Sequence, residues 1–374
     1  MSDSPKEFKE IWREPAKRGV EVISPNEVLR EILKSNMVLD SLYAIPPLLL
    51  NLCAHVEKDS CSYLGYKGGI IPIVMRRTFG IYALAQHSPP QIAVRGEGAR
   101  RIDVAENIKV LRSAFPALLI KLRQYPFDDA YLGSSADWGR GPRTDKRDIQ
   151  IDLTNPVRVI YSKVSKDYRS RLRKALNLDD DGVISSTTES LPSSVHDETS
   201  LDGVGKFGRL LGSTLRKISS QRDARNSEGF ILSYARDYAL LRKSFSTLRD
   251  CGLVKVFLAH DEQGNPGSGV VVLVSGKLIR SPMALLWLGG STPEGNRQGL
   301  SVALEWAVIT WLIRNSYNRY YLGGIGLEDT KGGPAQFKQG FGGRKVLGRV
   351  LWYSPFPLLG ELAERRDTLH WLGQ

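Results

Sequence analysis

A single lysine stands between two phenylalanines in the segment FKQGFGG at 337–343. When an amine attacks an ester or thioester carbonyl, negative charge develops on the carbonyl oxygen, and a fixed cation beside that oxygen lowers the barrier. Lys338 is our candidate for this cation, and Phe337 before it is a ring that could stack on a nucleic-acid base. In the alternative interpretation, Phe337 and Phe341 are core residues and Lys338 is a solvated neighbour.

The region around this lysine is rich in glycine, with eight glycines among the 24 residues of 320–343. Glycine costs backbone entropy. A strand pattern on either side argues against a linker, and the spacing excludes a phosphate cradle of the P-loop type. We therefore expect the glycines to end a strand at a cleft where substrate approaches the backbone, with ordinary turn glycines as the alternative. These cleft glycines are Gly323, Gly324 and Gly326.

Positive charge is concentrated between residues 158 and 174, which hold seven Lys or Arg residues and one acid, Asp167. Apolar residues at helical spacing give this segment an opposite, buried face. Arginine makes bidentate contacts to phosphate and lysine acts as a point charge, so the helix suits a diphosphate or a tRNA backbone. The candidate phosphate-binding and acceptor-binding residues are Lys166, Arg169, Arg173 and Lys174. A solvated helix face is the alternative. A weaker candidate of the same kind is the basic loop with Arg140, Arg143, Lys146 and Arg147.

The whole chain carries a net charge of +12 and has a pI near 9.5. This balance favours an anionic partner, such as nucleic acid, a phosphate-bearing substrate or an acidic membrane surface. The longest apolar runs are shorter than the ~20 residues that a membrane-spanning helix needs. The first residues lack the apolar core of a signal peptide. We therefore expect a cytoplasmic protein with at most peripheral membrane contact.

Several kinds of chemistry have no sequence support. The chain contains none of the motifs GxxxxGK[ST], HExxH and GxSxG, and no GxGxxG that opens a helix after a strand. Its five histidines are scattered, and its three cysteines lack the spacing of metal ligands. We expect no metal and no bound cofactor.

The first half predicts a series of short elements. A β-hairpin is expected over 61–77, a strand over 80–86 and a helix over 104–123 that Pro116 kinks. Strands are expected over 129–134 and 148–153, with a polar loop over 134–147 between them. Residues 185–203 read as a flexible loop.

The second half repeats this order of elements at an offset of roughly 190 residues. A helix over 233–250 precedes strands over 253–260, 270–276 and 284–290, and then come a helix over 299–315 and a strand over 319–324. Hairpins require antiparallel pairs, so we expect two α/β (α+β) domains, each with a mixed, largely antiparallel sheet flanked by helices. The expected boundaries are a leader at 1–23, domains at 24–150 and 151–357, and a C-terminal helix at 358–374.

Two segments together resemble the Fem family of peptidoglycan-bridge aminoacyl transferases, which belongs to the GNAT acyltransferase superfamily. One is the aromatic strand YYLGGIG followed by a glycine-containing loop and FKQGFGG. The other is SKDYRSRLRKALNLDDDGV, a basic helix followed by a Gly-Val turn. The similarity covers most of 150–352, and over 1–149 it rests on the order of elements.

The resemblance implies two tandem GNAT-like domains and transfer of an amino acid from aminoacyl-tRNA to an amine of a cell-wall precursor. Phe337 and Lys338 fall on the family's Phe-Lys pair, which contributes to the tRNA acceptor end and to charge stabilisation. Many members carry a long helical-hairpin arm in the second domain. This chain offers a polar loop at 185–206 and a modest helical stretch, so we expect the arm to be absent or very short.

The stretch GNRQGLSVALEW at 295–306 lies where CoA-dependent GNAT enzymes place an R/Q-x-x-G-x-G/A loop, which binds pyrophosphate at a helix N-terminus. Asn296, Gly299 and Ser301 occupy its three defining positions, so only the middle glycine is kept. This departure disfavours acetyl-CoA. The candidate donor-binding residues are Phe337, Phe341, Arg297 and Gly299.

The leading hypothesis is a Fem-like transferase whose catalytic residue is Lys338, with aminoacyl-tRNA as co-substrate and a phosphate-bearing amine as acceptor. One alternative is an acyl-CoA-dependent N-acyltransferase that modifies an exopolysaccharide or a lipid. The other is a non-catalytic nucleic-acid-binding protein that uses the basic helix.

Overall fold

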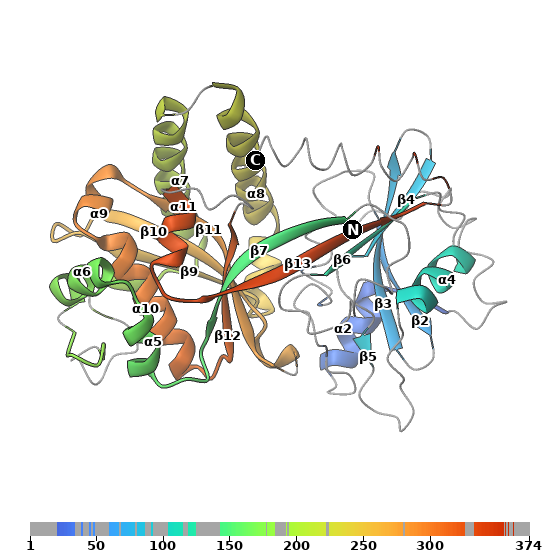
Figure 1. Ribbon diagram of the computed structural model, residues 1–374, viewed down its shortest axis with the longest axis horizontal. Helices are drawn as coiled ribbons and strands as arrows, with labels where there is room; N and C mark the ends of the chain where they lie inside the picture. The colour runs from blue at the N-terminus through green and yellow to red at the C-terminus, as the bar shows by residue number, and fades with distance from the viewer. Residues whose placement is uncertain are drawn as a thin grey trace. The chain divides into compact units, whose positions relative to one another are not determined.

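The computed structural model describes two compact units (Figure 1). The first comprises residues within 1–145, 278–280 and 347–369, and the second those within 146–277, 281–346 and 370–374. The described residues are 21–33, 39, 45, 48, 60–66, 69–78, 81–86, 91–92, 104–114, 119–124, 143–176, 178–183, 192, 194–221, 224–279, 281–325, 333–354, 356, 358 and 362.

The first unit is built on one sheet. Strands β2 (Ser60–Tyr66), β3 (Gly69–Thr78) and β4 (Ile81–Gln86) form consecutive antiparallel pairs, and β4 pairs in parallel with β6 (Leu119–Gln124). Short strands β1 (Glu21–Ile23) and β5 (Gln91–Ile92) extend it, and the end of β13 (Arg344–Tyr353) pairs with β6. The helices are α2 (Pro25–Leu33) and α4 (Val104–Ala114).

This unit confirms the predicted hairpin over 61–77 and the strand over 80–86, but the helix predicted over 104–123 is wrong. Helix α4 ends at Ala114, and β6 begins at Leu119. Pro116 lies between them and lacks the N–H that a continuing helix requires, so the apolar residues after it belong to a buried strand instead of a kinked helix.

The second unit contains a sheet in the order β7-β12-β11-β10-β9-β8. Its strands are β7 (Arg143–Asp152), β8 (Val195–Asp197), β9 (Val254–His260), β10 (Pro266–Val274), β11 (Met283–Ser291) and β12 (Arg319–Ile325). Every pair is antiparallel except β11–β12, which is parallel. The helices are α5 (Val157–Lys163), α6 (Lys166–Leu176), α7 (Leu201–Gln221), α8 (Ala224–Asp250), α9 (Pro293–Arg297), α10 (Leu300–Arg314) and α11 (Gly333–Gln339), with a 3₁₀ turn at Gly276–Leu278.

The helices of this unit cover both faces of its sheet. Phe257 and Ala259 of β9 join the core formed with α10 and α6. Leu258 between them points to the other face, because a Cβ added at Gly269 would lie 2.7 Å from Leu258 and 3.0 Å from Leu210 of α7. Figure 1 shows α5, α6 and α10 grouped together, with α7 and α8 as a neighbouring pair.

The two units share the order helix, antiparallel hairpin, third strand, helix and parallel strand. In the first unit these elements are α2, β2–β3, β4, α4 and β6, and in the second they are α8, β9–β10, β11, α10 and β12. The expectation of two mixed, largely antiparallel sheets flanked by helices is confirmed. The basic segment at 158–174 divides into α5 and α6, because Val164 between them is extended.

The predicted flexible loop is wrong in its last part, where β8 and the start of α7 lie, and the modest helical stretch is instead two helices of 21 and 27 residues. The glycines of α7 disfavour a helix in the sequence. Close contacts with neighbouring atoms explain why two of these positions are glycine. A Cβ at Gly203 would lie 1.9 Å from the carbonyl oxygen of Glu198, and one at Gly208 would lie 2.0 Å from the Tyr238 hydroxyl of α8. Helix α7 packs on the sheet and α8 is the helix that precedes β9, so the absence or shortness of the family's arm stays a prediction.

Residues 143–147, which we expected in a polar loop, belong to β7 together with the predicted strand over 148–153. The strand expected over 129–134 and the leader before residue 21 lie outside the described residues, as does nearly all of the expected C-terminal helix. No helix in the described part of the chain is long and apolar enough to cross a membrane.

Candidate active site

Strands β11 and β12 separate at the centre of the second sheet. They pair at three positions, from Met283–Arg319 to Leu285–Tyr321, although β11 continues to Ser291 and β12 to Ile325. The equivalent strands of the first unit, β4 and β6, stay paired to the last residue of β4. Within the described residues, the parallel strands therefore separate before their ends only in the second unit. We call the region beyond Leu285 and Tyr321 the strand opening.

The glycines of β12 lie in the strand opening. The pairing of β12 with β7 shifts register between Tyr321 and Gly324, and Gly323 at that shift has a φ of 79°. A positive φ strains any residue with a Cβ, which is why glycine stands at this bulge. The third predicted cleft glycine, Gly326, lies outside the described residues.

Lys338 of α11 reaches the strand opening with its ammonium group. Its Nζ donates a hydrogen bond of 2.9 Å to the carbonyl oxygen of Gly324. A Cβ added at Gly323 would lie 3.3 Å from this Nζ and 3.5 Å from the carbonyl oxygen of Leu286 on β11. The ammonium is thus held against β12, on the side that faces β11, and Gly323 leaves room for it.

Two carboxyl groups act on Lys338. Burial lowers the pKa of the lysine, while Asp148 of β7 and Glu305 of α10 raise it in part. The side chain of Glu305 is fully buried, and this burial raises its carboxyl pKa to about 7, opposed by Tyr320 and Lys338. Tyr320, also fully buried, has its pKa raised well above 10.0 by burial and by the neighbouring Glu305.

The residues that surround Lys338 are not among those predicted from the sequence. One usable signal was Glu305, a lone acid in the apolar run LSVALEWAVITWLI, since a buried carboxyl requires a partner or a shifted pKa. Asp148 and Tyr320 carried no signal of their own, because they fit ordinary strand patterns.

Aromatic side chains join the Phe-Lys motif to helix α6. The ring of Tyr168 lies 6.1 Å from Phe337 and 5.2 Å from Phe341, and the two phenylalanine rings are 5.3 Å apart. Phe341 is 1% exposed and belongs to the core, whereas Phe337 is half-buried. Of the two, Phe337 is therefore the ring that remains available to a ligand.

Backbone contacts also join the start of α6 to the residues that follow Lys338. The amide of Ser165, just before α6, donates a hydrogen bond of 2.9 Å to the carbonyl oxygen of Gly340. A Cβ at Gly342 would lie 2.1 Å from the carbonyl oxygen of Lys163. Two motifs that are about 170 residues apart in sequence thus form one structure.

We expect Gly342→Ala to lower the free energy of unfolding by about 3 kcal/mol, because a Cβ there meets backbone and Gly342 has a φ of 73°. Gly252→Ala is the matched control, since Gly252 has a φ of 67° with open space around it. That variant should lose only about 1 kcal/mol. Urea denaturation measures both, and equal losses would contradict the close contact at Gly342.

The basic residues of α6 differ in exposure. Arg173 is exposed and lies 3.8 Å from Asp180, and Arg169 is half-buried. Lys166 and Lys174 are exposed. An unpredicted member, Arg171, forms a 3.0 Å ion pair with Asp167. In the weaker basic group, Arg143, Lys146 and Arg147 belong to β7, and Arg140 lies outside the described residues.

The segment before α10 is held by its own polar side chains. Asn296 donates to the Ser291 hydroxyl at 2.7 Å and accepts from the Ser301 hydroxyl at 2.8 Å. Arg297 forms an ion pair with Glu294. Gly299 caps α10 with a φ of 77°, and a Cβ there would lie 3.9 Å from Cβ of Arg171 on α6. Helix α6 therefore touches both this segment and the Phe-Lys motif.

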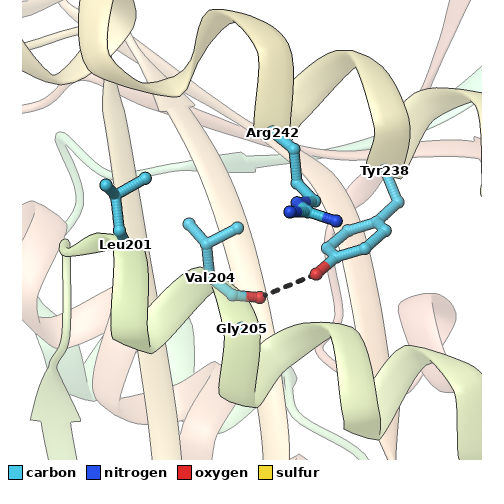
Figure 2. Close-up of a pocket in the computed structure, with 5 residues that line it drawn as sticks. All are labelled: Leu201, Val204, Gly205, Tyr238 and Arg242. Carbon is cyan, nitrogen blue, oxygen red and sulfur yellow. Dashed lines mark hydrogen bonds between the residues drawn. The ribbon is translucent and has the colours of Figure 1, made fainter.

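A cavity of about 410 Å³ lies between α7 and α8 (Figure 2). Tyr238 closes one side by donating a hydrogen bond of 3.2 Å to the carbonyl oxygen of Val204, and Arg242 reaches toward the same space. Its remaining lining residues are Leu201 and Gly205. None of the residues that line it belongs to the strand opening.

Comparisons with known proteins support the fold. No protein-family model and no curated protein sequence matches this chain. Among solved structures, FemX superimposes with a TM-score of 0.61 and 13% identity over 92% of this chain and 99% of that one. The C-terminal DUF2156 domain of an Agrobacterium fabrum protein assigned as a lysylphosphatidylglycerol synthetase gives 0.52 and 15%, over 92% and 97%. L-PGS from Bacillus licheniformis gives 0.50 and 14%, also over 92% and 97%. The chain therefore shares their GNAT-like fold.

Proposed function

We propose that this protein is a transferase that moves an aminoacyl group from aminoacyl-tRNA to an acceptor amine. The observation that carries the proposal is the Lys338 ammonium in the strand opening, beside the backbone of Gly323 and Gly324. A donor ester in this opening would have its carbonyl oxygen beside a fixed cation. Such preorganised charge stabilises the oxyanion of acyl transfer.

In this reaction the amine nitrogen attacks the ester carbonyl carbon, and the carbonyl oxygen becomes negative. The Lys338 ammonium donates a hydrogen bond to that oxygen. The carbon–oxygen bond of the ester then breaks, and the proton from the amine passes to the leaving ribose oxygen, which becomes a hydroxyl. Burial lowers the pKa of Lys338, which makes it a stronger hydrogen-bond donor while it remains charged.

The surroundings of α10 support a tRNA donor over acyl-CoA. The polar side chains of the segment before α10 bond to one another, and Arg297 pairs with Glu294. The basic helix α6 begins beside the Phe-Lys motif and offers exposed cations for a phosphate backbone. Half-buried Phe337 is our candidate for stacking on a terminal base.

The acceptor is either a cell-wall precursor amine or another phosphate-bearing molecule. Two of the structures with this fold are of lysylphosphatidylglycerol synthetase type. Phosphatidylglycerol offers hydroxyl groups and no amine, so it tests an alternative acceptor class in which an alcohol oxygen attacks the ester. We expect a cytoplasmic protein, with peripheral contact to a membrane if the acceptor is a lipid.

The decisive experiment incubates purified protein with a labelled, charged tRNA pool. Separate reactions contain amine acceptors, lipid-linked precursors or phosphatidylglycerol vesicles, and a parallel set replaces tRNA with acyl-CoA. Transfer of label from tRNA to an amine acceptor supports the proposal, whereas transfer only to phosphatidylglycerol would keep the tRNA donor and replace the amine with a hydroxyl. Turnover only with acyl-CoA, measured by thiol release, would replace it with the N-acyltransferase alternative.

The salt dependence of tRNA binding tests the basic helix. We expect the double variant Arg173→Ala, Lys174→Ala to bind uncharged tRNA more weakly and to reduce the slope of log K against log salt by about 1.5, because two phosphate contacts are lost. The control, Lys217→Ala with Lys243→Ala, removes the same charge from exposed positions on α7 and α8. Equal effects of both pairs would show that overall charge, rather than α6, binds the tRNA.

A further inference from the structure

Glu305 is the most unusual side chain in the second unit. It lies in α10 among apolar neighbours and is 0% exposed. Neither carboxylate oxygen has a hydrogen bond of ordinary geometry to the described residues, although the Tyr320 hydroxyl of β12 lies close enough to influence its pKa. A buried carboxyl without hydrogen bonds costs stability.

A structural role would be served better by an apolar residue. Replacing buried charge with well-packed apolar side chains is often neutral or stabilising, so a carboxyl at this position points to a functional use. Helix α10 already packs through buried residues on every side, including Trp306 and Leu304. What Glu305 adds to this helix is a charge.

The charge of Glu305 acts on Lys338. The ionisable groups of this cluster come from four elements, β7, α10, β12 and α11. Asp148 of β7 and Glu305 act on the ammonium of Lys338, and Tyr320 of β12 and Lys338 act on the carboxyl of Glu305. Asp148 approaches from the edge of β12, since its Oδ1 would lie 3.5 Å from a Cβ at Gly324. Glu305 is the fully buried carboxyl of this cluster, and Ala335 and Phe341, on either side of Lys338 in sequence, share one core with α10.

We propose that Glu305 is a positioning residue of this site, whose buried carboxylate keeps the Lys338 ammonium charged in the strand opening. The assignment deepens the proposed function and rests on it for the role of that charge in transfer. Burial alone would favour the neutral amine, which cannot stabilise an oxyanion as a cation does. With a carboxyl pKa of about 7, Glu305 supplies its charge at and above neutral pH.

The test follows the titration of Lys338 by NMR in full-length protein labelled with ¹³C at lysine Cε, with the resonance assigned through Lys338→Arg. We expect its midpoint in Glu305→Gln to fall by about one pH unit relative to wild type, because the counter-charge is lost. Thr310→Val is the control, since Thr310 is buried in the same helix and its hydroxyl donates a hydrogen bond to the carbonyl oxygen of Ala307. Its midpoint should equal that of wild type.

A midpoint unchanged in both Glu305→Gln and Glu305→Met would overturn the assignment. The titration needs no substrate, so it decides the Glu305 assignment even if no acceptor supports turnover, which would instead count against the proposed function. Where turnover is found, the alkaline limb of the kcat profile should move to lower pH by the same amount in Glu305→Gln, with the acceptor KM unchanged. A change in thermal stability without this movement would overturn the assignment and indicate a purely structural residue.

Discussion

Lys338→Ala should lower the rate of aminoacyl transfer by about 10²–10³-fold, the loss expected when one preorganised donor to an oxyanion is removed. The effect should appear in kcat, because the ammonium stabilises charge that is present only in the transition state. In the free protein Nζ bonds to the carbonyl oxygen of Gly324. Single-turnover transfer from labelled charged tRNA measures the loss, and circular dichroism checks the fold.

Two comparisons make this result specific. Lys338→Arg keeps the charge with a different geometry, so it should retain more activity than the alanine variant. Lys217→Ala, at an exposed position on α7, should behave as wild type. Binding of uncharged tRNA should be nearly the same in all three. Full activity of Lys338→Ala would reject Lys338 as the catalytic cation, and tRNA binding without any wild-type turnover would favour a non-catalytic nucleic-acid-binding protein.

Glu305→Gln should make the protein more stable at pH 8 by about 3 kcal/mol, the largest stability gain that we expect from a single substitution. The carboxyl pKa is about 7 in the folded protein against 4.5 for an unperturbed glutamate, because burial disfavours the charged form. The folded state thus holds the proton more tightly than the unfolded chain. The stability that this proton contributes is fully present below pH 4.5 and is lost as the pH rises through about 7.

Urea denaturation of wild type and Glu305→Gln from pH 4.5 to 8 measures this difference. The two proteins should diverge as the pH rises, with wild type losing stability relative to the variant. Thr310→Val, in the same helix, should keep the pH dependence of wild type. Parallel curves for wild type and Glu305→Gln would mean that Glu305 titrates as an ordinary glutamate, and the proposed counter-charge would lose its basis.

The order of elements in both units was readable from the sequence because it depends on local signals. Lys67-Gly68-Gly69 between two apolar runs predicted the first hairpin, which β2 and β3 confirm. Where local signals conflict, the elements predicted from the sequence are wrong. Pro116 suggests a kink, but the helix ends before it; the glycines of α7 suggest a loop, but two of them permit close packing.

The candidate site was readable only in part. The motif identifies Phe337 and Lys338, and the charge identifies the basic helix. That these residues bind the donor substrate stays a prediction. The contact between the two motifs, through Tyr168 and the backbone of Gly340, required the folded chain. Periodicity predicts which face of an element is buried, but it does not say which other element will cover that face.

By itself, the sequence determined two α/β units in tandem and a lysine in a glycine-rich segment. Only the tertiary structure decided that this lysine lies where β11 and β12 separate, and that a fully buried carboxyl belongs to a helix of the same core. Glu305 and Lys338 are far apart in the chain, and α10 is apolar on every side, so no periodic pattern marks the face that carries Glu305. The two residues come into one region because α10, β12 and α11 contribute to the same core, and long-range packing of this kind has no local signature in a sequence.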